Sequence, residues 1–361
     1  MSDFFEIDFL NVEAQKSGDA IGIRYQLNGR TTLHVVDGGY QDTGALMVDH
    51  IQRYYGNPRF LDHVVATHPD GDHAGGLRTV LESFQVGALW MFRPWQYAGL
   101  LLPQFHNYAS TDRLARRLKE IYSNLAALED IATARGIPIY EPHQGQIIGA
   151  FRVLAPSLPR FLNLVVSSER TPESTVHANQ GSLSALSERL GDALAKLRTL
   201  VKGLWGHEIF SPEGASAENE MSVVQFARLC GQRILLTGDA GREALTEAAD
   251  FAPVAGLQLR GIDRFQVPHH GSRRNVSTEI LDRWLGPRFQ TPLTPMKFEA
   301  YNSSAKADED HPRKCVVRAI HHRGGRLYDT KHGSIRAHAG PAPFRGWGAA
   351  IASEYPAEQE T

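Results

Sequence analysis

Short apolar stretches with alternating polar positions recur along the chain and predict β-strands. The first of these stretches span residues 4–12, 20–27 and 32–37, and Asn28-Gly29 between the last two is a strong hairpin signal. Helical spacing appears between later strand patterns, most clearly at 111–135, where apolar residues three and four apart share one face. Because strands and helices alternate in both halves of the chain, we expect an α/β protein.

Two segments depart from this pattern in composition. Residues 157–217 are rich in Ser, Glu and Pro and contain one amphipathic helical pattern at 186–201. We expect this segment to be a mostly helical insertion that adds no strand to the core of one domain spanning residues 1–340. Residues 341–361 are rich in Pro, Ala, Gly and Glu, a composition that predicts a flexible tail.

The charge balance and the cysteine count exclude several classes of protein. Lys and Arg total 38 against 40 Asp and Glu, so a strongly basic nucleic-acid-coating protein is excluded, although a local basic groove is not. Two cysteines are too few for a disulfide scaffold or a Cys-rich zinc finger. No apolar run reaches the roughly 18–20 residues that span a membrane, and the acidic start differs from a signal peptide. We therefore expect a cytoplasmic protein with no membrane partner.

The strongest chemical signal is the run His68-Pro69-Asp70-Gly71-Asp72-His73, which directly follows an apolar strand. Its proline and glycine interrupt regular structure, so a tight loop can turn the His and Asp side chains toward one point. Carboxylates crowded this closely repel one another unless a cation neutralises them. A solvated turn rich in His and Asp is the alternative, and the crowding argues against it. The run therefore predicts a metal site.

Two further strand ends carry the same residue types. The apolar strand at 234–237 is followed by Gly238-Asp239, and Val267-Pro268 is followed by His269 and His270. The first signal is weak by itself, because many plain turns contain an Asp, and the second is moderate. Strand ends in α/β proteins meet at one edge of a sheet, so the three segments together predict a single cluster.

In this order the motifs resemble the metallo-β-lactamase fold superfamily of hydrolases, and more narrowly the hydrolase domain of ComEC-type DNA-uptake competence proteins. The superfamily pattern His-x-His-x-Asp-His has Asp70 at its second His here, as in the competence branch. The resemblance covers residues 4–155 and 218–338 and implies a four-layer αββα sandwich with two metal ions at one edge. Further matching stretches are Phe9-Leu10-Asn11-Val12, Gly18-Asp19-Ala20, Val36-Asp37-Gly38-Gly39, Asn219-Glu220-Met221-Ser222-Val223-Val224, Leu236-Thr237-Gly238-Asp239, His269-His270-Gly271-Ser272, Tyr328-Asp329-Thr330 and Gly333-Ser334-Ile335.

The resemblance also implies a ligand set. In chain order the implied metal ligands are His68, Asp70, Asp72, His73, Asp239 and His270. His68 and Asp70 would hold one ion. Asp72, His73 and His270 would hold the other, and Asp239 would bridge both. Within this set Asp72, His73 and Asp239 would be the residues on which catalysis depends.

Four more residues bear on the completeness of the implied centre. Asp37 would buttress the ligand loop, and His269 is the alternative to His270 as the last ligand. Asn219 stands where the family usually supplies another His to the first metal. The first metal site, that of His68 and Asp70, would therefore bind its ion weakly, be completed by substrate or stay empty, unless His207 from the insertion supplies the missing imidazole.

One or two divalent ions are the cofactors that this set implies. Asp70 and Asn219 in place of histidines make the first site rich in oxygen, which favours Mn²⁺ or Mg²⁺, whereas the histidines of the second site suit Zn²⁺. Such ions lower the pKa of a bound water, so a metal-activated hydroxide is the expected nucleophile. The absence of Gly-x-Ser-x-Gly and Gly-x-Gly-x-x-Gly motifs argues against a serine hydrolase and a nicotinamide enzyme.

Basic residues after the last ligand indicate the substrate class. Arg273 and Arg274 follow His270 closely, and we expect both to bind substrate near the metals. Others follow at Arg313, Lys314, Arg318, Arg323 and Arg326. Each is by default a surface charge, but together they favour a phosphodiester.

We therefore expect a nuclease or phosphodiesterase acting on a nucleic acid or nucleotide. One alternative is a hydrolase of small esters or lactones, because this fold hosts many chemistries. Another is a component of a multi-protein bacterial defence assembly, with the helical insertion binding a protein partner.

Overall fold

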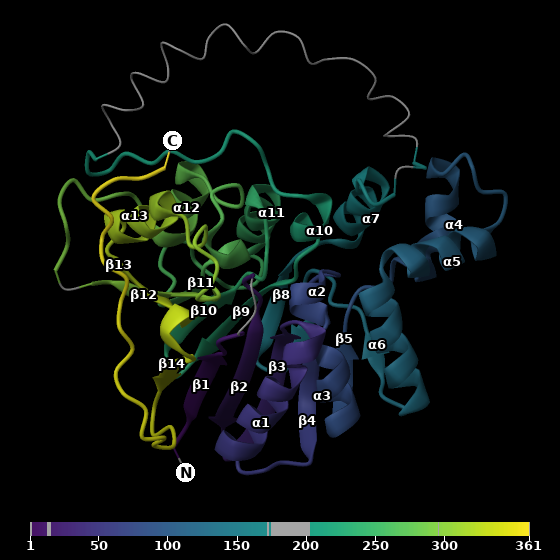
Figure 1. Cartoon of the computed structure of the whole chain (residues 1–361), viewed down its shortest axis with the longest axis horizontal. Coiled ribbons are helices and arrows are strands. Elements are labelled where there is room, and N and C mark those ends of the chain that lie inside the picture. Colours follow the sequence, from purple (N-terminus) through teal and green to yellow (C-terminus); the bar gives the residue numbers. More distant parts are fainter. Residues whose placement is uncertain (1, 13–15, 172, 175–202, 295, 361) are drawn as a thin grey trace, which may run out of the picture.

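Two seven-stranded sheets form the centre of the molecule, which is a computed structural model that describes residues 2–12, 16–171, 173–174, 203–294 and 296–360. In each sheet one half is antiparallel and the other half is parallel. Helices cover the outer face of each sheet (Figure 1), which gives the order helix, sheet, sheet, helix. The α/β class and the four-layer αββα sandwich predicted from the sequence are confirmed.

The first sheet contains the N-terminal strands and one strand from the end of the fold. Its order is β14-β1-β2-β3-β4-β5-β6. The bounds are β1 (Phe4–Phe9), β2 (Ala20–Leu27), β3 (Arg30–Gly38), β4 (Phe60–Val65), β5 (Gln85–Trp90), β6 (Ile139–Tyr140) and β14 (Ile335–Ala339). Asn28 and Gly29 form the predicted tight turn between β2 and β3, both with positive φ, as a hairpin of this kind requires.

The second sheet repeats this arrangement with the later strands, in the order β13-β12-β11-β10-β9-β8-β7. The bounds are β7 (Ile147–Ile148), β8 (Phe151–Ala155), β9 (Val224–Leu229), β10 (Gln232–Leu236), β11 (Arg264–Gln266), β12 (Phe298–Asn302) and β13 (Gly325–Asp329). Strands β10 to β13 are parallel, so the loops after β10 and β11 leave the sheet at the same edge.

Each sheet has its own helices on its outer face. Helices α1 and α3 contact the first sheet and α6 packs on α3, whereas α11 and α13 contact the second sheet and α12 packs on α11. The bounds are α1 (Gly44–Tyr54), α2 (Gly71–Ala74), α3 (Leu77–Ser83), α4 (Ala98–Leu101), α5 (Thr111–Ile121), α6 (Ser123–Ala134), α7 (Leu158–Ser167), α10 (Ala217–Glu220), α11 (Arg242–Phe251), α12 (Thr278–Leu285) and α13 (Lys314–His322).

The inner faces of the sheets pack directly on each other. Phe9 of β1 stacks on Tyr301 of β12 with ring centroids 5.0 Å apart, and His34 of β3 meets Phe151 of β8 edge to face at 5.4 Å. Apolar residues of both sheets share one buried cluster. Removal of this apolar surface from water is the main force that holds the two halves together.

The predicted helix at 111–135 is wrong as a single element. Its spacing of apolar residues is present, but the chain breaks at Tyr122 into α5 and α6. Tyr122 has ψ 49° rather than a helical value and its side chain is buried. The apolar pattern of residues 111–135 resembles that of one helix, because the residues on both sides of the bend face the same core.

The predicted insertion begins as part of the packed domain. Within residues 157–217, helix α7 buries Phe161, which stacks on Phe92 with ring centroids 4.1 Å apart. Further on, the Trp205 indole N–H donates to the carbonyl of Phe289 at 2.7 Å. The described part of this segment contains no strand. The amphipathic pattern at 186–201 lies outside the described residues.

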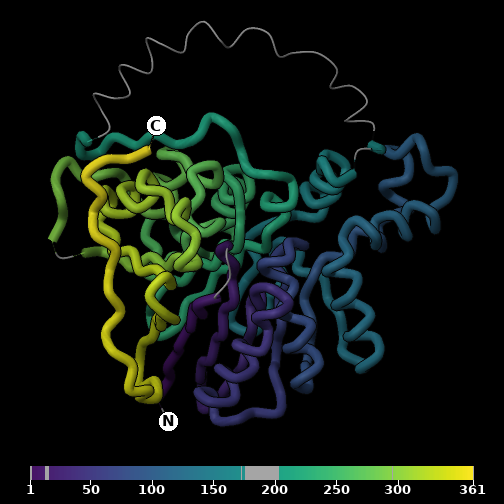
Figure 2. The backbone as a smooth tube through the Cα atoms, viewed as in Figure 1, coloured from purple at the N-terminus to yellow at the C-terminus, as the bar shows by residue number. Residues whose placement is uncertain are grey.

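The C-terminal segment differs from the predicted flexible tail. Figure 2 shows the C-terminal segment, in yellow, running along one side of the molecule from its lower end to its top. Arg345 forms ion pairs with Glu6 at 2.8 Å and Asp8 at 2.6 Å, and the Glu360 carboxylate accepts from backbone N–H groups at the start of α13. Composition alone predicts disorder here because it does not reveal these distant partners.

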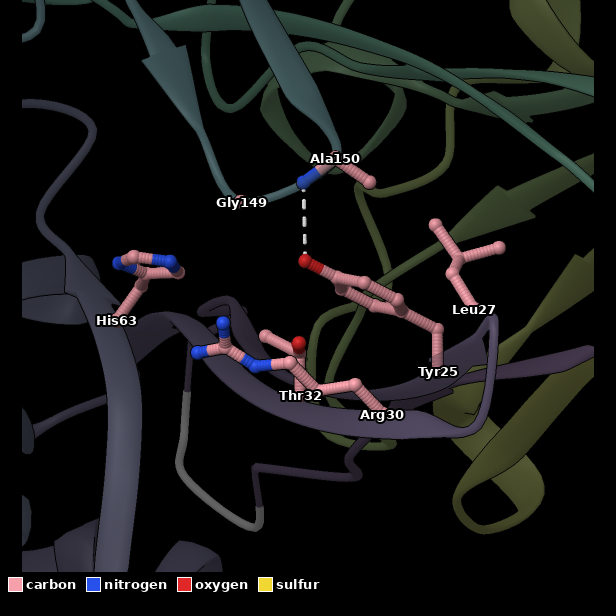
Figure 3. A pocket seen from close by; sticks show the side chains of 7 residues that line it. All are labelled: Tyr25, Leu27, Arg30, Thr32, His63, Gly149 and Ala150. Carbon is pink, nitrogen blue, oxygen red and sulfur yellow. Dashed lines mark hydrogen bonds between the residues drawn. The ribbon is translucent and has the colours of Figure 1, made fainter.

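A separate hollow of about 280 Å³ opens at the far end of the sheets, where β3 begins. Tyr25, Arg30 and His63 line it, and the Tyr25 hydroxyl accepts a hydrogen bond of 2.9 Å from the Ala150 N–H (Figure 3). Gly149 passes close above Tyr25 in this view. In the described residues no helix is both long and apolar enough to cross a membrane.

Candidate metal centre

The predicted ligands are brought together at one edge of the sandwich. His68 follows β4, Asp72 and His73 lie in α2, Asp239 follows β10, and His270 lies in the turn after β11. In β3, β4, β10 and β11 the chain runs toward this edge, because β3 and β4 pair parallel, as do β10 and β11. The topology thus joins segments that are more than 160 residues apart in the sequence.

Short distances define the cluster. Nε2 of His73 lies 3.1 Å from Oδ1 of Asp239, and Nε2 of His68 lies 3.6 Å from Oδ2 of the same carboxylate. Nε2 of His270 lies 3.5 Å from Oδ2 of Asp72. Asp239 therefore lies between two imidazoles.

Hydrogen bonds at Nδ1 orient the three imidazole rings. His73 donates to Asp37 at 2.8 Å, and His270 donates to the carbonyl of Ser303 at 2.9 Å. The Thr67 hydroxyl donates to Asp37, so at 3.0 Å it accepts from His68. With each Nδ1 acting as donor, each Nε2 is left to face the cluster with its lone pair or a second proton.

Buried atoms without partners show that a cation fits this cluster. The Nε2 atoms of His68, His73 and His270 and the Oδ1 atom of Asp239 are buried and have no hydrogen-bond partner among the described residues. Buried polar atoms are rarely left unpaired. One ligand atom each from Asp72, His73 and His270 lie within 4.8 Å of one another, as they do for Asp19, His73 and Asp239. Imidazole nitrogens with carboxylate oxygens are a donor set suited to Zn²⁺ and related ions.

The charges in the cluster are strongly coupled. Burial by itself would lower the pKa of His270, but the carboxylates of Asp239 and Asp72 outweigh it and raise this pKa to about 9. Burial opposes ionisation of Asp72 as well, yet the neighbouring imidazoles of His270 and His73 hold its pKa below the usual range. Without a metal, protons therefore neutralise the carboxylates, and a bound cation would replace those protons.

The turn that carries His269 and His270 is strained. Both residues have positive φ, 48° and 55°, a region that side chains other than Gly rarely adopt. His270 points into the cluster, while Nδ1 of His269 lies 3.2 Å from Asp239 and contacts the amide of Asn219. Strained backbone of this kind is often found at functional sites.

Asp19 was not predicted as a site residue. It is buried, lies 3.9 Å from Nδ1 of His73, and accepts a 2.9 Å hydrogen bond from the Gln266 side chain. Burial raises the pKa of its carboxyl group. The sequence signals were the Gly18-Asp19 pair before a strand, which is also the signature of an ordinary turn, and the place of Gly18-Asp19-Ala20 among the stretches that carry the resemblance.

Arg170 is the second residue that the sequence did not reveal. It follows α7, and its guanidinium donates to Oδ1 of Asp70 at 2.6 Å. Asp70 also lies 3.7 Å from Nε2 of His68. A guanidinium is thus part of the half of the centre to which His68 and Asp70 belong.

Most of the arginines predicted to favour phosphate have other partners. Arg274 pairs with Glu213 on the surface, and Arg313 pairs with Asp310 at 2.9 Å. The contribution expected from Arg318 and Arg323 is wrong, because both side chains are buried. Arg318 donates to the carbonyls of Leu204, Pro356 and Ala357, and Arg323 binds Glu208 and Asp282. They fix chain segments rather than face a substrate.

One protein-family model matches part of the chain. Residues 24–94, which contain β2 to β5 and the His68–His73 loop, match the model of the metallo-β-lactamase superfamily. No curated protein matches the chain. This match and the αββα sandwich show the fold that the motifs predicted.

Similar solved structures are distant. One is the crystal structure of hydrolase AbOPH in the β-lactamase superfamily, with 11% identity and a TM-score of 0.32, covering 66% of this chain and 69% of that one. Another is AidC, a dizinc quorum-quenching lactonase in complex with a product, N-hexnoyl-L-homoserine, with 9% identity and a TM-score of 0.29, covering 61% of this chain and 56% of that one.

Proposed function

We propose that the protein is a metal-dependent hydrolase that cleaves phosphodiesters, as a nuclease or phosphodiesterase. The observation that carries the metal-dependent part is the set of buried Nε2 atoms of His68, His73 and His270 and the buried Oδ1 atom of Asp239, none of which has a hydrogen-bond partner among the described residues. Each imidazole ring is fixed through its Nδ1 atom, so the Nε2 atoms are free to bind a cation together with the Asp239 carboxylate. They are well arranged to hold a cation.

The residues divide into two positions around Asp239. Asp72, His73, His270 and Asp239 would hold one divalent ion, and His68 with Asp70 faces a second position. When bound, such an ion supplies the Lewis acidity that activates water and stabilises developing negative charge. Asp37 keeps the His73 ring in place through the bond to Nδ1.

The ligand types bear on the identity of the metal. The position with His73 and His270 offers two imidazoles and two carboxylates, a set that Zn²⁺ and Mn²⁺ both accept. The position with His68 and Asp70 is richer in oxygen and favours Mn²⁺ or Mg²⁺. We propose Zn²⁺ or Mn²⁺ as the working ion.

The phosphodiester substrate is supported by charge at the site. Arg170 places a guanidinium beside Asp70, with 44% of its side chain exposed to solvent. Guanidinium groups bind phosphate oxygens through two parallel hydrogen bonds. The resemblance of the His-x-Asp-x-Asp-His motif to the ComEC-type branch points to nucleic acid as well. A nucleic acid or nucleotide is therefore the proposed substrate.

Cleavage assays with and without the metal test this proposal. The purified protein is stripped with a chelator, reloaded with Zn²⁺, Mn²⁺ or Mg²⁺, and assayed on single-stranded DNA, on RNA, and on a neutral ester and a lactone. We expect cleavage of a nucleic acid only in the reloaded protein, and none by Asp72→Ala. Asp49→Ala, which alters an exposed carboxylate of α1, is the matched control and should retain full activity.

The assay also tests the phosphodiester substrate and the metal dependence separately. Hydrolysis of only the neutral ester or lactone would contradict the phosphodiester substrate and leave the metal-dependent hydrolase in place. Full nuclease activity of the Asp72→Ala variant would contradict the metal assignment.

A further inference from the structure

We infer that the centre holds a single divalent ion and that the guanidinium of Arg170 takes the place of the second. The inference rests on the proposed metal-dependent function and specifies its stoichiometry. The key contact is the 2.6 Å hydrogen bond from Nη2 of Arg170 to Oδ1 of Asp70. Asp70 is one of the few groups that a second ion could use, and it already carries a cationic partner.

The guanidinium is held in this position by its surroundings. Nε of Arg170 lies 3.8 Å from the buried carboxylate of Glu218, so two carboxylates flank the positive charge. The backbone N–H of Arg170 donates at 3.0 Å to the hydroxyl of Ser168, and that hydroxyl donates to Glu218. Desolvation alone would lower the pKa of Arg170, but Asp70 and Glu218 outweigh it and raise this pKa.

The second position also lacks ligands. Asn219 stands in place of the imidazole that the superfamily supplies, and its amide is engaged with Nδ1 of His269. Among the described residues, Nε2 of His68 and the carboxylate of Asp239, which is shared with the other position, are what remains to hold an ion there. A divalent ion there would have two or three ligands and a neighbouring guanidinium that repels it.

The position formed by Asp72, His73, His270 and Asp239 is, by contrast, well supplied with ligands. Asp72, His73 and His270 offer ligand atoms within 4.8 Å of one another, and Asp239 adds its carboxylate. The guanidinium of Arg170 bonds to Asp70 and not to these ligands. This position is therefore the one that takes the ion, and Asp70 anchors Arg170 instead of binding metal.

A metal count for each variant tests the inference without relying on activity. Chelator-stripped protein is titrated with Mn²⁺, followed by the spin-resonance signal of the free ion, and total Mn²⁺ is measured after gel filtration. The wild type should bind one ion per chain. Arg170→Ala should bind a second, weaker ion at His68 and Asp70, whereas Arg170→Lys, which keeps a positive charge, should still bind one.

Two further variants complete the experiment. Arg283→Ala removes an arginine that pairs with Asp250 on the surface, and it should bind one ion as the wild type does. Asp70→Ala should keep one ion with an affinity within about threefold of the wild type, because Asp70 is not a ligand of that ion. Circular dichroism of each variant confirms that the counts come from folded protein.

Several results would overturn the inference. Two ions in the wild type would refute it and leave the proposed function intact. One ion in folded Arg170→Ala would show that Arg170 does not exclude the second, and a tenfold loss of affinity in Asp70→Ala would make Asp70 a ligand. No bound ion in any variant would refute the proposed function itself.

Discussion

His73 and Asp37 are joined by a 2.8 Å hydrogen bond from the imidazole Nδ1 to a carboxylate oxygen, and both side chains are fully buried. Asp37 is at the end of β3 with φ 56°, and it also accepts from the N–H and hydroxyl of Thr67. One carboxylate thus fixes the ring of a proposed metal ligand and the chain just before His68. The ligand loop is held in position by the first sheet.

Removal of this carboxylate should weaken metal binding without removing a ligand. Asp37→Ala is expected to lower the affinity for Mn²⁺ or Zn²⁺ by about 10- to 100-fold, because the His73 ring loses the bond that orients it. Competition with a chelator of known affinity measures this. Asp62→Ala is the matched control, since Asp62 also accepts from a backbone N–H, that of Leu33, but away from the site. Equal affinities for the two variants would contradict the orienting role of Asp37.

The C-terminal segment should contribute strongly to stability through Arg345. Its side chain is 3% exposed and pairs with Glu6 and Asp8, which are both fully buried. Arg345→Ala leaves these carboxylates with fewer cationic partners, so the free energy of unfolding should fall by about 3 kcal/mol. Urea denaturation measures the change.

The surface pair of Arg283 and Asp250 provides the comparison for Arg345. Arg283→Ala should cost less than about 1 kcal/mol, because an exposed ion pair contributes little. A loss of this small size in Arg345→Ala would show that residues 341–360 do not stabilise the fold.

Glu208 should make stability depend on acidic pH. Burial raises its pKa, but hydrogen bonds from His322 and Arg323 outweigh this and lower the pKa from 4.5 to about 2. A carboxylate with a lowered pKa stabilises the fold fully above its unfolded value, and this contribution is lost as the pH falls from about 4.5 to about 2. The shift corresponds to about 3 kcal/mol.

Urea denaturation of Glu208→Gln beside the wild type checks this expectation. The difference in the free energy of unfolding should be largest near pH 7 and should shrink steadily below pH 4.5. A difference that stays constant down to about pH 2 would show that the ionised form of Glu208 is not what stabilises the fold.

Gly149 should tolerate no side chain, because a Cβ atom there would lie 2.3 Å from the Tyr25 hydroxyl. Gly149→Ala is therefore expected to destabilise the protein by a clash between the two sheets in addition to the strain of its positive φ of 60°. Gly136 has nearly the same φ, 64°, and open space around it, so Gly136→Ala carries the strain alone, about 1 kcal/mol. Thermal unfolding should show a clearly larger loss for Gly149→Ala, and equal losses would rule out the clash.

The sequence predicted those residues of the metal centre that lie in short motifs or directly after an apolar strand. His68, Asp72 and His73 lie in one loop, and Asp239 and His270 each follow an apolar strand, so topology alone brings them to one edge. Arg170 could not be predicted in this way. It reaches Asp70 across 100 residues of sequence, and a lone Arg after a helix resembles any surface charge.

The features for which the structure differs from the sequence-based prediction share one physical cause. Arg318 and Arg323 are buried with fixed partners, although a sequence suggests exposure for an arginine by default. Arg345 meets Asp8 across 337 residues, so composition could not show that the tail is tied down. Each depends on pairing between distant segments, which hydrophobic periodicity does not report.

The most direct test of the account is the position of the metal in crystals of the protein grown with Zn²⁺ or Mn²⁺. An anomalous-scattering map should show one strong peak within about 2.0–2.6 Å of ligand atoms of His73, His270, Asp239 and Asp72, with the guanidinium of Arg170 still at Asp70. No peak at this cluster, or a peak held by other residues, would contradict the claim that these side chains form a metal centre.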